Sequence, residues 1–253
     1  MRVTLEITAI ILRLVTPPVD EIELPKYLIQ HSNLPGPRAN LELLDVVARA
    51  SASRADLIPI YERWLGLPTV SNDPAEYLST VAAAALGSIA IEFDSDTACI
   101  VNRLLRNAAN DPRWRVREGV AMGLQRIGEA DFDTLDALLS RWAIDATFME
   151  QRAIAAALAH PPFLKSPGVA IQALAIMRPI ALTIAGVDSA TRKTIEFKTV
   201  EQGLSYTLSV VVTAAPEPGF GMLATLIDSG DKSLRAIIQE NLNKKRLVGK
   251  FPS

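Results

Sequence analysis

The most constraining feature of this chain is a sequence register that recurs four times. In each copy an Asp-Pro turn or its equivalent precedes an apolar residue followed by arginine or a substitute for it. A residue that is usually small follows four positions later, and an apolar residue follows seven positions later. The four copies are residues 73–86, 111–124, 151–159 and 231–242. Steps of roughly 35 to 42 residues are typical of two-helix solenoid repeats, so we expect stacked helical hairpins rather than one closed globular core.

A fifth, weaker copy fits between the third and the fourth. Its positions are held by Asp188, Lys193, Phe197 and Val200. No low-complexity linker divides the chain, so we expect one continuous array over residues 1–253. In this organisation residues 1–53 form N-terminal capping helices, residues 54–247 form the repeats, and residues 248–253 form a tail.

Apolar residues spaced three to four apart predict helices along the chain, and prolines and glycines mark their ends. The predicted helices are 1–15, 22–28, 38–50, 54–67, 74–93, 96–109, 113–128, 132–145, 148–160, 167–185, 191–215, 219–227 and 232–247. Asp73-Pro74 and Asp111-Pro112 each place an N-cap aspartate before a proline, whose missing N–H costs nothing in the first turn. Pro179 lies inside its predicted helix, and the β-branched run 210–213 also fits a strand.

The composition suits closely packed helices and gives no general attraction to polyanions. Apolar residues make up 49% of the chain and aromatic residues 6%, and the formal net charge is −2. Strong binders of nucleic acid or anionic membranes usually carry a basic excess. The charge alternates along the chain: residues 1–100 and 127–150 are net acidic, whereas residues 101–126 and 151–200 are net basic.

The single cysteine, Cys99, cannot form an internal disulfide or a metal cage, and we expect it to be a small core residue. The longest uncharged stretches are too short to cross a bilayer as helices. Residues 1–15 predict a helix rather than a signal peptide, because Arg13 interrupts their apolar run and they carry Glu6. They also lack a small-residue cleavage site and run into Pro17-Pro18. We therefore expect a soluble cytoplasmic protein with no membrane partner.

The string Asp111-Pro112-x-x-x-Val116-Arg117-x-x-x-Ala121-x-x-Leu124 resembles the HEAT and armadillo class of α-solenoids, and the pattern covers most of residues 54–247. The resemblance implies an all-α fold, a right-handed α-α superhelix of HEAT-like helical hairpins. It also implies a ladder of aspartate–arginine hydrogen bonds between neighbouring repeats. Asp111 and Arg117 match both ladder positions, Arg152 and Arg235 match the arginine, and Asp73 matches the aspartate. Ser79 and Ala146 interrupt the ladder.

HEAT-type arrays mostly bind other proteins along their concave face, so the resemblance implies a protein or peptide partner. Some arrays that resemble this chain bind nucleic acid or act on it, notably the HEAT-like alkylpurine DNA glycosylases, which place tryptophans and an aspartate in a basic cleft. Trp142 and Asp145 stand three residues apart near Arg141, but their spacing does not reproduce the motif of that family. Fold alone does not fix function.

Motifs for catalysis, nucleotides or metals are weak. The only histidines, His31 and His160, lie beside proline breaks, and a histidine in such a turn more often caps a carbonyl than acts as a base. The segment 219–221 lacks the third glycine of a phosphate-binding loop. The aspartates at 131, 133 and 136 lack the loop of a calcium site and suit a helix start instead. We expect no cofactor, no metal and no small-molecule ligand.

The best local candidate for partner binding is the arginine-rich segment that begins at Arg113. Its candidate contacts are Arg113, Arg115, Glu118, Met122 and Arg126, with Gln125 as an alternative to Arg126. On a helix, the last four project away from the side that buries Val116 and Leu124, and arginines there could bind carboxylates or phosphates. The alternative interpretation is a solvated charged face.

Three hypotheses follow from the sequence. The first is a non-enzymatic scaffold that binds a protein or peptide on its concave helical face. The second is a nucleic-acid-binding protein, favoured by the two basic bands, whose affinity would fall steeply with salt. The third is a glycosylase-like enzyme that depends on Asp145. We expect binding rather than catalysis.

Overall fold

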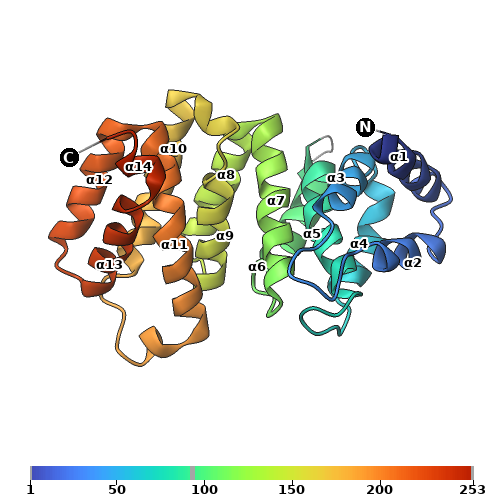
Figure 1. Cartoon of the computed structure of the whole chain (residues 1–253), viewed down its shortest axis with the longest axis horizontal. Helices are drawn as coiled ribbons and strands as arrows, with labels where there is room; N and C mark the ends of the chain where they lie inside the picture. The colour runs from blue at the N-terminus through green and yellow to red at the C-terminus, as the bar shows by residue number, and fades with distance from the viewer. Residues whose placement is uncertain (1, 92–94, 252–253) are drawn as a thin grey trace. The chain divides into compact units, whose positions relative to one another are not determined.

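The protein is seen in a computed structural model that describes residues 2–91 and 95–251, and this part of the chain is built from helices. The all-α prediction is therefore confirmed. By its internal contacts the chain divides into two compact units, the N-terminal unit Met1–Ala130 and the C-terminal unit Asp131–Ser253 (Figure 1). One continuous right-handed array stays a prediction.

The N-terminal unit is built around helix α5. The described α-helices of this unit are α1 (Arg2–Val15), α2 (Glu23–Gln30), α3 (Leu41–Ala50), α4 (Ile58–Leu65), α5 (Glu76–Ala90), α6 (Ser95–Ala109) and α7 (Trp114–Ala130). A 3-10 turn, Ala55–Leu57, leads into α4. Helix α5 contacts α3, α4, α6 and α7, and all its residues from Glu76 to Ile89 are buried. Because small and apolar side chains line α5 on all sides, other helices can pack around it.

Glycines allow α5 and α7 to touch backbone to backbone. A Cβ atom on Gly87 would lie 2.0 Å from the carbonyl oxygen of Gly123, and one on Gly119 would lie 2.5 Å from the carbonyl oxygen of Thr80. Gly119 and Gly123 are one turn apart on α7, so they present one flat stripe to α5. Any side chain on this stripe would force the two helices apart.

Both Asp-Pro turns bind backbone N–H groups just before the following helix, but the prolines do not occupy the first helical position as predicted, and the N-cap of α5 is Ala75 rather than Asp73. A carboxylate oxygen of Asp73 accepts a hydrogen bond from the backbone N–H of Ala75 at 2.7 Å. The carboxylate of Asp111 accepts one from the backbone N–H of Arg113 at 2.8 Å. These bonds satisfy N–H groups that have no partner within the helix. Regular helix begins shortly afterwards, at Glu76 and Trp114.

The C-terminal unit is centred on helix α11. Its described α-helices are α8 (Phe132–Ala143), α9 (Phe148–Leu158), α10 (Pro167–Thr183), α11 (Ile195–Ala214), α12 (Pro216–Asp228), α13 (Lys232–Leu242) and α14 (Lys245–Val248), with 3-10 turns at Phe163–Lys165 and Thr191–Lys193. Helix α11 contacts α9, α10, α12, α13 and α14. The run 210–213 is helical, because burial of Val211 and Val212 against these neighbours outweighs a weak strand preference.

Two sequence expectations are wrong. The predicted helix 232–247 is broken, since α13 ends at Leu242 and α14 begins at Lys245. Cys99 is exposed rather than part of the core. The predicted helix end at residue 93 and the last two residues of the predicted tail lie outside the described residues. Within the described chain, no helix combines the length and the apolar character needed to span a membrane.

Candidate ligand-binding cleft

A cleft in the C-terminal unit is a candidate site. It has a volume of about 520 Å³, within the range of small-ligand and peptide pockets. It is lined by the end of α9 and the turn after it, by the last turns of α11, and by α14 and the residues after it. The lining residues are Ala159, Pro161, Leu164, Lys165, Tyr206, Val210, Thr213, Ala214, Arg246 and Lys250.

Local sequence explains how the walls of the cleft form. Pro161 and Pro162 follow the end of α9, and a proline cannot continue the helix. On the other side, the fully buried Asn241 ties the end of α13 to α11. Its side-chain amide donates to the carbonyl oxygen of Leu204 at 2.9 Å and accepts from the N–H of Ser209 at 2.8 Å. With α13 held in this way, the break after it lets α14 pack on α11 (Figure 1).

Positive charge gathers on one wall of the cleft. The guanidinium carbon of Arg246 lies 4.4 Å from the ring centroid of Tyr206, a distance typical of a cation–π contact. Among the described residues Arg246 has no hydrogen-bond or ion-pair partner, and its Nη1 atom is buried. Lys165 and Lys250 add two exposed ammonium groups. No lining residue is acidic, so these charges are not neutralised within the cleft.

Lys244 lies beside this cluster but is already paired. Its ammonium nitrogen is 2.9 Å from a carboxylate oxygen of Glu240 and 5.8 Å from the ring centroid of Tyr206. The hydrogen bond from Lys244 is the main reason why the pKa of Glu240 lies below its usual value. Arg246 therefore differs from Lys244 in lacking a carboxylate partner.

The floor of the cleft is apolar. Leu164 is buried, and Ala159, Val210 and Ala214 are half-buried, so they present apolar surface to an occupant. The hydroxyl of Thr213 donates to the carbonyl oxygen of Ser209 at 2.6 Å. A hydroxyl whose hydrogen is already used keeps oxygen lone pairs that can accept an N–H group. The cleft thus combines cations, an acceptor and an apolar surface.

The prediction that Arg115 projects away from the buried side is wrong. Arg115 is only 5% exposed. Its Nη2 donates to the carbonyl oxygen of Gly36 at 2.6 Å, and its Nη1 lies 3.4 Å from the carboxylate of Glu76, which is fully buried. The interpretation as a solvated face fails for the same reason. A buried carboxylate needs a cation beside it, and residues far away in the sequence supply the pair.

Arg113 is also buried, with 6% exposure, and so cannot meet a partner on an open face. Two of its guanidinium nitrogens donate to the carboxylate of Asp111, at 2.8 and 2.6 Å. The third nitrogen, Nη1, reaches the preceding hairpin and donates to the carbonyl oxygen of Leu67 and to the hydroxyls of Thr69 and Ser79. Nη2 donates in addition to the carbonyl oxygen of Leu65. The bond to Asp111 is the main cause of a raised pKa of Arg113.

At this turn Asp111 binds Arg113, and Arg113 reaches the preceding hairpin, whereas the ladder between Asp111 and Arg117 stays a prediction. Arg117 donates within its own turn, to the carbonyl oxygens of Asp111 and Pro112 at 2.6 and 2.9 Å, while the carboxylate of Asp111 binds Arg113. Arg235 is exposed and has no ion-pair partner among the described residues. Asp231 binds Arg192 instead, at 2.7 Å. Arg152 is half-buried and lies against Gly203, and its ladder role stays a prediction.

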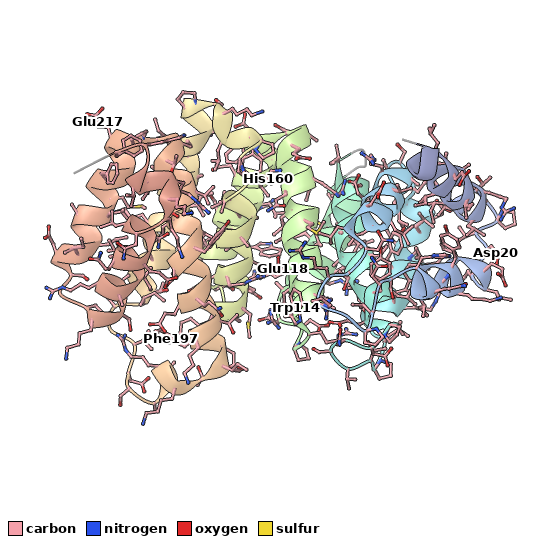
Figure 2. The ribbon with its side chains drawn as sticks, in the orientation of Figure 1. Asp20, Trp114, Glu118, His160, Phe197 and Glu217 are labelled. Carbon is pink, nitrogen blue, oxygen red and sulfur yellow. The ribbon has the colours of Figure 1, made fainter. Side chains whose placement is uncertain are left out.

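The three other predicted contacts on α7 are half-buried. Arg126 forms an ion pair with Asp45 at 2.6 Å, within the N-terminal unit. Glu118, which Figure 2 labels with Trp114, and Met122 lie on the same helix. Their role in partner binding stays a prediction.

The glycosylase hypothesis loses its central residues. Helix α8 ends at Ala143, so Trp142 and Asp145 do not share a helix face. Trp142 is 1% exposed and belongs to the core, where it cannot stack on a base. Of the histidines, neither His31 nor His160 lines the cleft. Among the described residues no group of three or more side chains could hold a metal ion, and Asp131 caps α8 as expected.

Sequence reasoning missed the cleft, although one signal was present. The run at 244–246 suggested only a favourable interaction with a helix dipole. Glu240 stands four residues before Lys244, whereas Asn241 and Leu242 stand four residues before Lys245 and Arg246. On the predicted helix 232–247, only the first of these three cations therefore has an acidic residue one turn before it.

Comparisons with known proteins leave the family open. Neither a protein-family model nor a curated protein matches the chain. Among solved structures, the chain is similar to the crystal structure of an engineered protein from the Northeast Structural Genomics Consortium. The two share 14% sequence identity over 89% of this chain and 98% of that chain, with a TM-score of 0.31. A TM-score of this size does not establish a shared fold.

Proposed function

We propose that this protein is a non-enzymatic, HEAT-like scaffold that binds a protein or peptide partner. The partner segment binds in the cleft described above, which we call the Tyr206–Arg246 cleft of the C-terminal unit. One observation carries the proposal: a cationic wall faces an apolar floor in a cleft of about 520 Å³ that no acidic side chain lines. Such a surface suits a short segment that carries both an apolar side chain and a negative charge.

The chemistry of the lining supports binding rather than catalysis. The lining residues include no Asp, Glu, His or Cys, which are the side chains that most often serve as general bases or nucleophiles. As part of the proposal, the HEAT-like superhelix and a cytoplasmic location carry over from the sequence. The single cysteine is consistent with a reducing compartment.

The test is a selection of twelve-residue peptides against the whole chain, in one library displayed with a free C-terminus and in a second library fused to its carrier at that end. We expect enrichment of peptides that combine apolar and acidic groups. Arg246→Glu should abolish their binding, because it places a negative charge beside Tyr206. Arg235→Glu is the matched control, since Arg235 is an exposed arginine of the same unit outside the cleft. A failed selection, or equal loss in both variants, would refute the proposal.

A second candidate function is the binding of single-stranded nucleic acid. It is favoured by Tyr206, which is 54% exposed and flanked by Lys244 and Arg246. Aromatic side chains beside cations are the usual stacking platforms for single strands. Anisotropy titrations with labelled single-stranded DNA and RNA at two salt concentrations test it. Affinity that falls steeply with salt and is lost in Tyr206→Ala would favour this function over the first.

A further inference from the structure

We propose that the Tyr206–Arg246 cleft recognises the free C-terminus of a peptide whose last side chain is apolar. This inference rests on the proposed function and names the group that is bound. It commits to the terminal carboxylate rather than an acidic side chain or a phosphate.

The first argument is the state of Arg246. Tyr206 covers one face of the Arg246 guanidinium. The N–H groups of a guanidinium point outward within its plane, so the ring does not block their hydrogen bonds. The Nη1 of Arg246 is buried without a partner, whereas Nε and Nη2 are not among the buried unpartnered atoms and bond to none of the described residues, so the edge formed by Nε and Nη2 is the one that a ligand can reach. A planar carboxylate matches that edge with two parallel hydrogen bonds. The arginine is therefore ready to receive a carboxylate without first losing another partner.

The second argument is that the cations and the apolar floor lie in one cleft. Arg246, Lys165 and Lys250 share it with Leu164 and Val210. At a peptide C-terminus the carboxylate and the last side chain branch from the same Cα atom. A single terminal residue can therefore bind the cations with its carboxylate and the apolar floor with its side chain. An acidic side chain brings charge without an apolar group on the same residue, and a phosphate brings no apolar group at all.

The third argument concerns the last amide of the peptide. A terminal residue also presents one backbone N–H, which needs an acceptor when water is displaced. The Thr213 oxygen can accept it, because the hydroxyl hydrogen is directed to Ser209. A volume of about 520 Å³ accommodates the end of a chain rather than a folded domain. The cations, the apolar floor, the Thr213 acceptor and the size of the cleft therefore all fit the C-terminal residue of a peptide.

The experiment compares matched peptides on the whole chain by fluorescence anisotropy. Fluorescein-labelled hexapeptides that end in Ala, Val, Leu or Phe are each prepared as the free acid and as the C-terminal amide. The protein is used as wild type, as Arg246→Gln and as the control Arg235→Gln. Thermal unfolding and circular dichroism establish that each variant is folded.

We expect free acids to bind about tenfold or more tightly than the amides, as one charge-assisted hydrogen-bond pair implies. Arg246→Gln should bring this ratio close to one, whereas Arg235→Gln should leave it unchanged. Equal affinity of acid and amide would overturn the inference. If displayed peptides that lack a free C-terminus bind and depend on Arg246, the proposed function stands and this inference fails. If no peptide of either kind binds, both fail.

Discussion

The two units share an arginine–aspartate arrangement, but other arginines differ between them in whether a carboxylate pairs with them. In the N-terminal unit Arg113 joins Asp111 to the preceding hairpin. In the C-terminal unit Arg192 binds Asp231 and Ser233 and also donates to the carbonyl oxygens of Ile184 and Val187. Each arginine thus links a loop to the start of a helix further along the chain. The two units therefore share one kind of link, which we call the arginine joint: an arginine that binds the aspartate before a helix and also binds the backbone of a loop.

Beyond this joint the units diverge. Arg115 and Arg126 of the N-terminal unit pair with Glu76 and Asp45. Arg246 of the C-terminal unit lies over Tyr206 in a cleft without an acidic partner. A buried, paired arginine is part of the fold, because removing it leaves a buried charge or buried carbonyls unsatisfied. An arginine without a partner in a cleft is free to bind a ligand.

The largest expected effect tests the arginine joint. Arg113→Gln removes the donors to Asp111, Thr69 and two loop carbonyls, so it should lower the free energy of unfolding by about 3–5 kcal/mol. Urea denaturation measures this change. Arg235→Gln, at an exposed arginine, should stay within about 0.5 kcal/mol of wild type. Similar values for the two variants would show that the joint contributes little.

The next prediction concerns helix packing. Gly87→Ala puts a methyl group 2.0 Å from the carbonyl oxygen of Gly123, so α5 and α7 must separate. We expect a loss of about 3 kcal/mol, at the upper end for overpacked sites. Gly221→Ala in α12 meets nothing within 4 Å and should stabilise the C-terminal unit by about 0.5–1 kcal/mol. Calorimetry measures both, and a tolerated Gly87→Ala would contradict the close backbone contact.

A third prediction tests the joint of the C-terminal unit through pH. Burial raises the pKa of Asp231. The hydrogen bonds from the Leu234 N–H, the Arg192 guanidinium and the Ser233 N–H together lower this pKa by more than burial raises it, so it lies below its usual value. A carboxyl with a lowered folded-state pKa stabilises the protein above its unfolded pKa, and that stability is lost as pH falls through the folded value. The contribution should be complete above about pH 4.

Asp231→Asn should therefore cost about 1–2 kcal/mol at neutral pH, because the amide keeps one acceptor but loses the charge. Denaturation curves at several pH values measure the difference between variant and wild type. That difference should shrink as the pH falls below about 4, where the aspartate of the unfolded chain becomes protonated, and should vanish once the pH lies below the lowered folded-state pKa. A difference that is constant from pH 7 down to strongly acidic conditions would show that the charge of Asp231 does not matter.

Local rules predicted much of the fold from the sequence. The Asp-Pro turns at 73–74 and 111–112 bind the starts of α5 and α7, and the apolar spacing located nearly every helix. These features depend on neighbours within a few residues. The break between α13 and α14 was missed, because it depends on Asn241 holding α13 to α11.

The sites depend on residues far apart in the sequence, so they could not be predicted in the same way. Arg115 was expected to face outward, yet the groups that bury its charge are Gly36 and Glu76. Helical periodicity identifies one buried face of a helix. It does not show whether segments from elsewhere in the chain also cover the opposite face. Tyr206 and Arg246 meet only because α14 packs on α11.

The smallest expected effect gives the sharpest comparison between the units. Arg246→Gln removes a cation–π contact with Tyr206 but no hydrogen bond to the described residues, so it should change the free energy of unfolding by at most about 1 kcal/mol. Urea denaturation of Arg246→Gln and Arg113→Gln side by side makes the measurement. Two arginines of one chain would then differ severalfold in their contribution to stability. A loss at Arg246 as large as that at Arg113 would mean that Arg246 serves the fold, and the cleft would lose the argument that its arginine is available to a ligand.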